Sequence, residues 1–205
     1  MNSASHILMG RLVRQYVQEH YGIGLDERNF LLGNVLPDYL PSFLTRPHFL
    51  RYNAGHVRRL MRNLISGLSS PEKKAPKRSR HSLALGVICH FYTDFFCYAH
   101  SPCFRQGLRK HAEYEERLDQ YFKENIHKLC RLSVIIPAAQ YSCVQDIYAR
   151  FEKLQSSYRA AERTFSSDLV YAFYACVDVI VALTGCAAAQ AQKTMPLRAA
   201  RLRAV

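Results

Sequence analysis

The segment HFYTDFFCYAH carries three side chains that could ligate a metal ion. His90 and Asp94 are four residues apart, so on a helix they lie on one face, and His100 follows six residues later. His111 and Glu115 in KHAEYEERLD repeat the four-residue spacing. Imidazole and carboxylate groups together suit zinc or a similar first-row divalent ion. On successive helices these pairs could point five ligands into one cleft, although one isolated pair of this kind is usually an ordinary side-chain contact.

The first of these pairs lies in one of the most aromatic passages of the chain. Phe91, Tyr92, Phe95, Phe96 and Tyr98 surround it in sequence. Polar side chains are costly to bury in such surroundings unless another group satisfies them. A metal cluster walled by aromatic side chains would supply that compensation.

Two upstream stretches add further candidate ligands. SASHILMG places His6 beside apolar residues, and LLGNVLPDYLPSFLTRPHF offers Asp38 and His48 in a proline-rich segment. His56 is the only serious rival to His48. The full candidate set is therefore His6, Asp38, His48, His90, Asp94, His100, His111 and Glu115.

In this order the eight residues form a pattern that resembles the zinc-dependent phospholipase C family. The motifs are His-x3-Asp-x5-His and His-x3-Glu, preceded by Pro-Asp and a later histidine, and the resemblance is clearest over residues 6–124. The family consists of all-helical enzymes with a three-zinc cluster, related in fold to the P1/S1-type nucleases. The resemblance therefore implies two to three zinc ions per chain.

The resemblance also implies roles for individual residues. The ligands would be His48, His90 and Asp94 for one zinc; His100, His111 and Glu115 for a second; and His6 with the other oxygen of Asp94 for a third. Asp38 would be the general base, and Tyr39 matches an aromatic position that lines the choline pocket in the secreted enzymes. Those enzymes complete the third position with an N-terminal tryptophan, and this chain has no tryptophan. The third position could use the backbone of Met1, use another ligand or be empty.

Three classes of function agree with this pattern. The first is a zinc metallophosphodiesterase that hydrolyses phospholipids or related phosphoesters with a metal-activated water. The second is a P1/S1-like nuclease or nucleotidase, which the net charge of +12 favours slightly because nucleic acid is a polyanion. The third is a non-catalytic, metal-stabilised helical protein that binds anionic membranes through the basic segment 71–80 and the basic C-terminal tail. We expect the first, because Asp38 would not be a structural metal ligand, so its presence favours an enzyme over a metal-stabilised scaffold.

The elements that must position these residues are all predicted to be helices. Apolar residues recur at helical spacing over 5–20, and Asp26 can cap a short helix through ERNFLLG. The segment 34–49, with three prolines, is predicted to be an irregular loop. Further helices are expected at 49–67, 80–100, 104–125, 143–163 and 166–190. The chain is thus predicted to be one all-α domain over 1–205, in which 126–205 completes the core and offers no candidate site residue.

Composition bears on the compartment. Seven cysteines without a CxxC pair predict reduced thiols, and the N-terminus shows no signal-peptide pattern. The apolar run LVYAFYACVDVIVALTGCAAA contains Asp178, which favours a buried core helix over a membrane span. We therefore expect a cytoplasmic protein, with association with membranes as the alternative.

Overall fold

The computed structural model describes residues 1–40, 47–69, 78–133 and 143–202, with side chains omitted at 68–69 and 190–202. The described residues form helices joined by loops and contain no strand, which confirms the all-α class. The elements are α1 (Ser3–Tyr21), α2 (Glu27–Tyr39), α4 (Leu50–Ser69), α5 (Arg78–Phe95), the short 3₁₀ helix η1 (Tyr98–His100), α6 (Gly107–Leu129), α7 (Val144–Ala160) and α8 (Phe165–Leu202).

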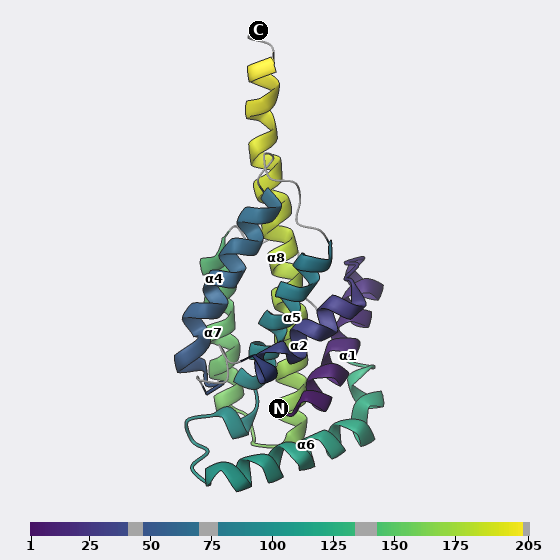
Figure 1. The fold of residues 1–205 in the computed structure, drawn as a ribbon, viewed down its shortest axis with the longest axis vertical. Helices are drawn as coiled ribbons and strands as arrows, with labels where there is room; N and C mark the ends of the chain where they lie inside the picture. The colour runs from purple at the N-terminus through teal and green to yellow at the C-terminus, as the bar shows by residue number, and fades with distance from the viewer. Residues whose placement is uncertain (41–46, 70–77, 134–142, 203–205) are drawn as a thin grey trace.

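Helix α8 runs through the middle of the bundle and extends beyond it at its C-terminal end (Figure 1). Phe173, Val177 and Ile180 on this helix are completely buried. The stretch Phe165–Ala189 is long and apolar enough to cross a membrane, but 67% of its most apolar window is covered by the rest of the bundle. Asp178, within that stretch, pairs with Arg150 of α7 at 2.9 Å. These contacts support the prediction of a core helix.

Two glycines bring α2 and α5 into close contact. A β-carbon added to Gly33 would meet the carbonyl oxygen of Leu83, and one added to Gly86 would meet that of Phe30. Only glycine therefore allows the two backbones to approach this closely. Because Asp38 lies near the end of α2, this contact brings it toward the ligand-bearing half of α5.

Helix α2 is longer than predicted. The expected loop over 34–49 is wrong for its first part, because the helix continues through Pro37 to Tyr39, and the Leu40 amide closes its last turn on the Leu36 carbonyl at 3.1 Å. A proline inside a helix removes one backbone hydrogen bond, and close packing on α5 offsets this loss. The predicted Asp26 cap is confirmed: its side chain accepts from the Asn29 amide at 2.9 Å. Residues 41–46 of the expected loop lie outside the described residues.

Helix α5 is shorter at its C-terminus than the predicted 80–100. It ends at Phe95, Cys97 is extended, and η1 carries His100. In a continuous helix His100 would lie about 9 Å beyond Asp94 along the axis, whereas its Nε2 atom is 3.5 Å from Asp94 Oδ1. The break after Phe95 therefore folds His100 back onto the cluster.

The remaining expectations concern cysteines and basic segments. All seven cysteines are free, and four of them are buried, namely Cys89, Cys97, Cys176 and Cys186. The basic segment predicted over 71–80 lies outside the described residues up to residue 77, and Arg78 begins α5. In the basic tail only the helical backbone to Leu202 is described.

Candidate metal centre

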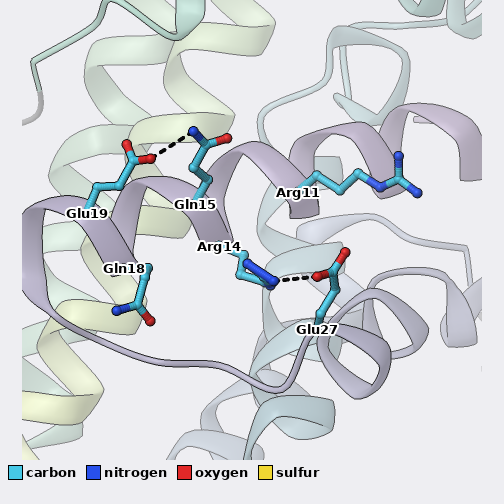
Figure 2. Close-up of a pocket in the computed structure, with 6 residues that line it drawn as sticks. All are labelled: Arg11, Arg14, Gln15, Gln18, Glu19 and Glu27. Atoms are coloured by element: carbon cyan, nitrogen blue, oxygen red, sulfur yellow. Dashed lines mark hydrogen bonds and ion pairs between the residues drawn. The ribbon is translucent and has the colours of Figure 1, made fainter.

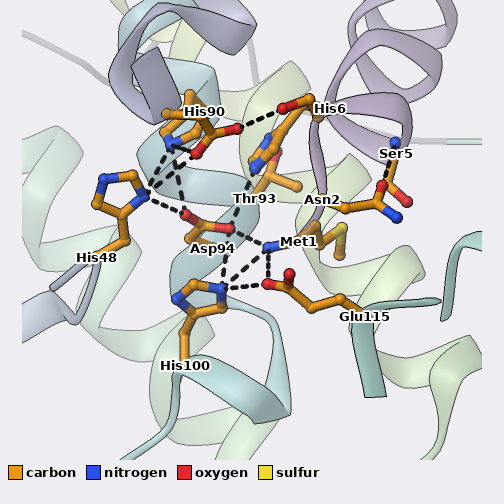
Figure 3. Close-up of polar contacts among 12 residues, drawn as sticks. Met1, Asn2, Ser5, His6, His48, His90, Thr93, Asp94, His100 and Glu115 are labelled. Carbon is orange, nitrogen blue, oxygen red and sulfur yellow. Dashed lines mark hydrogen bonds and ion pairs between the residues drawn. The ribbon is translucent and has the colours of Figure 1, made fainter. Parts of the chain in front are cut away.

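The eight predicted ligand and base residues come from α1, α2, α5, η1, α6 and the segment before α4. The structure brings all of them to one cluster around Asp94, and Figure 3 shows six of them, namely His6, His48, His90, Asp94, His100 and Glu115. Asp94 is fully buried near the end of α5, and both its oxygens have imidazole neighbours. The roles of these residues as ligands remain a prediction, while their convergence is an observation.

The first predicted set surrounds the Oδ2 atom of Asp94. His48 Nδ1 lies 3.1 Å from this oxygen, and His90 Nε2 lies 3.4 Å from it and 3.1 Å from His48 Nδ1. The other nitrogen of His90, Nδ1, donates to the Asn34 carbonyl at 2.8 Å. This bond leaves the Nε2 lone pair pointing into the cluster, as a metal-binding histidine requires.

Burial controls the charge of His90. Removal from solvent, followed by the positive potential of the adjacent His6, holds the pKa of His90 well below its usual value. For His48, burial alone would lower the pKa, but the hydrogen bond with Asp94 raises it. Despite its burial, Asp94 has a pKa well below the usual range because of the neighbouring His100 and the Met1 amine. A neutral imidazole and an ionised carboxylate are the forms that bind metal.

The second predicted set meets at one oxygen of Glu115. His100 Nε2 lies 2.9 Å from Oε1, and His111 Nε2 lies 3.1 Å from the same atom. These two hydrogen bonds hold the pKa of Glu115 well below its usual range even though burial opposes it. Burial lowers the pKa of His100 to about 4. The set therefore offers two imidazoles and one ionised carboxylate.

The amino group of Met1 lies in the same cluster. It contacts Asp94 Oδ1 and lies 3.0 Å from both Glu115 Oε1 and His100 Nε2. Burial would lower the pKa of this amine, but the negative charges around it, that of Asp94 first, together with the hydrogen bond to Asp94 outweigh burial and raise the pKa to about 12. The ammonium supplies positive charge to the Asp94 and Glu115 carboxylates. A metal cation bound in the same place would neutralise the same two carboxylates.

His6 provides a separate test of whether the residues fit a metal. It is completely buried, and neither ring nitrogen has a hydrogen-bond partner within the described chain. Its Nε2 lies 3.2 Å from Asp94 Oδ1, and its ring stacks on His90 at 4.0 Å between centroids. A buried imidazole without a partner is costly, and a metal ion that accepts its lone pair would remove that cost. His6, the ammonium site and the His/carboxylate sets all fit zinc.

Asp38 is a partly exposed member of the cluster. Its Oδ1 atom is 3.6 Å from His90 Nε2 and 3.7 Å from His48 Nδ1, while Oδ2 accepts a hydrogen bond from Ser3 Oγ at 2.9 Å. The side chain is 22% exposed, so water can reach it. Partial burial raises the pKa of Asp38. Asp38 also forms a potential ligand group with His6 and His90, so its geometry suits either a base or a ligand.

A buried acid in the C-terminal third supports the second set. Asp168 at the start of α8 is 1% exposed. It accepts hydrogen bonds from the Tyr98 amide at 2.9 Å, the Tyr114 hydroxyl at 2.9 Å and the Tyr158 hydroxyl at 2.6 Å. Tyr98 begins η1, which carries His100, and Tyr114 precedes Glu115. The sequence offered no candidate site residue within 126–205, and no sequence motif indicated Asp168.

Asp168→Asn is expected to weaken zinc binding at the His100, His111 and Glu115 set by roughly 10–100-fold, because supporting partners orient metal ligands. Asparagine keeps one acceptor oxygen for the Tyr98 amide, but its NH₂ group replaces the second acceptor oxygen, and hydrogen bonds to a neutral amide are weaker than those to a carboxylate. Competition with a chelator, followed by metal counting, measures the affinity. The matched control is Asp178→Asn, on the same helix, whose carboxylate pairs with Arg150. An equal loss of zinc affinity in both variants would contradict a specific role for Asp168.

Two other candidates from the sequence, Tyr39 and His56, lie outside the cluster. Tyr39 is 65% exposed and lines none of the described cavities, so its role in substrate binding remains a prediction. The ring of His56 packs against Phe91, with centroids 6.0 Å apart, and His48 takes the place in the cluster.

A hollow of about 580 Å³ beside α1 and α2 lies away from the cluster (Figure 2). Its side chains largely pair with one another: Arg14 contacts Glu27, and Gln15 donates to Glu19 at 2.8 Å. These pairs use charges that a ligand would need, so we place no site there.

Comparison with known proteins gives one match. A family model described as zinc dependent phospholipase C matches residues 5–172, which is most of the chain. No curated protein and no solved structure matches. The matched region contains all eight cluster residues and also Asp168.

Proposed function

Because the chain belongs to the zinc-dependent phospholipase C family, we propose that it is a zinc metallophosphodiesterase that hydrolyses a phosphoester bond of a phospholipid. The observation that carries this proposal is the convergence of three groups of potential metal ligands on one cluster, with the partly exposed carboxylate of Asp38 beside them. A purely structural metal site is closed by its ligands, whereas a catalytic site keeps an open position. The side chains of Asp38 and His111, which are 22% and 24% exposed, leave the cluster partly open to solvent.

Each residue has a role in this proposal. Zinc, when bound, would act as a Lewis acid toward the phosphate and make a water molecule more acidic. The predicted sets would hold it: His48, His90 and Asp94; His100, His111 and Glu115; and His6 with Asp94. Asp38 would accept the proton of the attacking water, because its raised pKa makes it a stronger base than an exposed aspartate.

The Met1 amine supports one of the options for the third position. In a chain that begins at Met1, this amine lies against Asp94 Oδ1, the same oxygen that His6 approaches. As a neutral amine it would be a nitrogen donor to zinc in the same place. We include it in the proposed third ligand set with His6 and Asp94.

Protein purified without chelator is expected to contain two to three zinc ions per chain, measured by elemental analysis. Zinc at about 100 times its dissociation constant adds about 2.7 kcal/mol to the folded state for each site. Chelation should therefore lower Tm by roughly 5–10 °C for each zinc ion removed. Zinc should restore Tm and magnesium should not, because magnesium prefers oxygen ligands.

Two further measurements make this prediction sharper. A Gly-Ser extension ahead of Met1 should remove about one zinc equivalent if the amine is a ligand. A zinc content near zero after purification in zinc-containing buffer would rule out the cluster.

The substrate class is tested by assaying the zinc-loaded protein on phosphatidylcholine and on single-stranded DNA. We expect turnover of the lipid. Turnover of DNA alone would favour the nuclease alternative. Full zinc occupancy without turnover of either would favour the metal-stabilised scaffold.

A further inference from the structure

A cavity of about 600 Å³ adjoins the metal cluster. Its walls come from the start of α4, the end of α5, η1 with the loop that follows, and the end of α7. His100 lines this cavity and also belongs to the predicted zinc set with His111 and Glu115. The volume lies in the range of about 300–1,000 Å³ that is typical of small-molecule sites. The cavity is thus placed to receive a group attached to a phosphate at the cluster.

The walls of the cavity are largely apolar. The apolar side chains are Phe49, Leu50, Phe95, Tyr98, Pro102 and Phe104. Two polar side chains in the wall are already engaged: Gln155 donates to the Phe95 carbonyl at 2.8 Å, and Tyr158 donates to Asp168 at 2.6 Å. These two groups offer a ligand little hydrogen bonding, and the Ser101 hydroxyl, which has no hydrogen-bond partner among the described residues, is itself buried. The walls therefore favour a hydrocarbon group over a polar one.

The exposed side chains of the cavity carry net positive charge. Arg51, Arg159 and Arg163 are exposed, against one exposed acid, Glu162. Arg51 lies over the Tyr52 ring at 4.5 Å, and Arg163 lies over the Tyr98 ring at 5.0 Å. Basic side chains beside an apolar opening are attracted to the phosphates of an anionic lipid surface.

We propose that this cavity binds the glyceride side of the phospholipid. The first carbons of an acyl chain lie between the aromatic walls, and the three arginines contact phosphates of neighbouring lipids. This assignment rests on the proposed function, because the His100 end of the cavity is where the phosphate is held. The cavity assignment makes the end of α7 part of the substrate site.

The chain contains its own reporter for this proposal. Cys103 is exposed and lines the cavity, whereas Cys130 is exposed and does not. The rates at which iodoacetamide modifies the two thiols can be followed by mass spectrometry on zinc-loaded protein. Dihexanoylglycerol at about ten times its dissociation constant should slow modification of Cys103 about tenfold and leave Cys130 unchanged.

Two variants separate cavity binding from a general effect of lipid. Leu50→Glu places a charge in the apolar wall, at a helix N-terminus where an acidic residue is tolerated. It should abolish the protection of Cys103. Leu108→Glu is the control, because Leu108 is 90% exposed and does not line the cavity; it should leave the protection unchanged.

The other outcomes decide against the proposal. Protection by phosphocholine or by dAMP, with none by dihexanoylglycerol, would assign the cavity to a headgroup or a nucleobase. Modification of Cys103 can be measured without substrate turnover, so the proposed hydrolysis and the proposed glyceride binding are tested independently. If the protein hydrolyses phospholipid but dihexanoylglycerol does not protect Cys103, only the cavity assignment is overturned. If dihexanoylglycerol protects Cys103 but the zinc-loaded protein has no activity, only the proposed hydrolysis is overturned.

Discussion

Asp38→Asn is expected to lower kcat by about 10²–10⁴-fold, the usual contribution of a general base. Asparagine is nearly isosteric with aspartate but cannot accept the proton of the attacking water. The fold and the zinc content should survive, because the side chain is partly exposed at the edge of the cluster. Hydrolysis of phosphatidylcholine by zinc-loaded protein and elemental analysis of the same sample measure both effects.

Ser3→Ala is the matched control for this variant. It removes the hydrogen bond that Ser3 Oγ donates to Asp38 but keeps the carboxylate. A single hydrogen bond of this kind corresponds to a loss of about tenfold or less. Loss of zinc in Asp38→Asn would instead make Asp38 a ligand with His6 and His90. Full turnover in Asp38→Asn would leave catalysis in place and remove Asp38 from it.

Asp94→Asn is expected to be the most damaging single change among the ligands. Its two oxygens face different partners: Oδ1 faces His6, His100 and Met1, and Oδ2 faces His48 and His90. Loss of this charge should therefore remove more than one zinc equivalent, whereas His100→Ala should remove about one. In metal-free protein it also leaves the buried Met1 ammonium without its nearest counter-charge, at a cost of about 3–5 kcal/mol.

Metal counts per folded chain, after gel filtration, compare these variants. His56→Ala is the control, because His56 lies outside the cluster and should retain all the zinc. If Asp94→Asn keeps full zinc occupancy while His100→Ala loses it, Asp94 does not bridge two cations.

Local sequence patterns were sufficient for the helical class, and together with the resemblance to the zinc-dependent phospholipase C family they singled out the cluster residues. Helical spacing predicts α1, and the Asp26 cap predicts the start of α2, because caps and periodicity act over a few residues. The four-residue spacing of His90 and Asp94 likewise defines one face of a helix without any tertiary information. The eight residues that the sequence singled out are the ones that meet.

Only the tertiary structure decided how those residues meet and what surrounds them. The turn after Phe95 that returns His100 to Asp94 includes a hydrogen bond from the Tyr98 amide to Asp168, which is seventy residues from Tyr98 in sequence. The close approach of α2 and α5 at Gly33, and the cavity that α7 completes, also join distant segments. Helical periodicity shows which face of a segment is buried, but it holds no information about its partner. Packing between distant helices supplies that information, and with it the shape of the site.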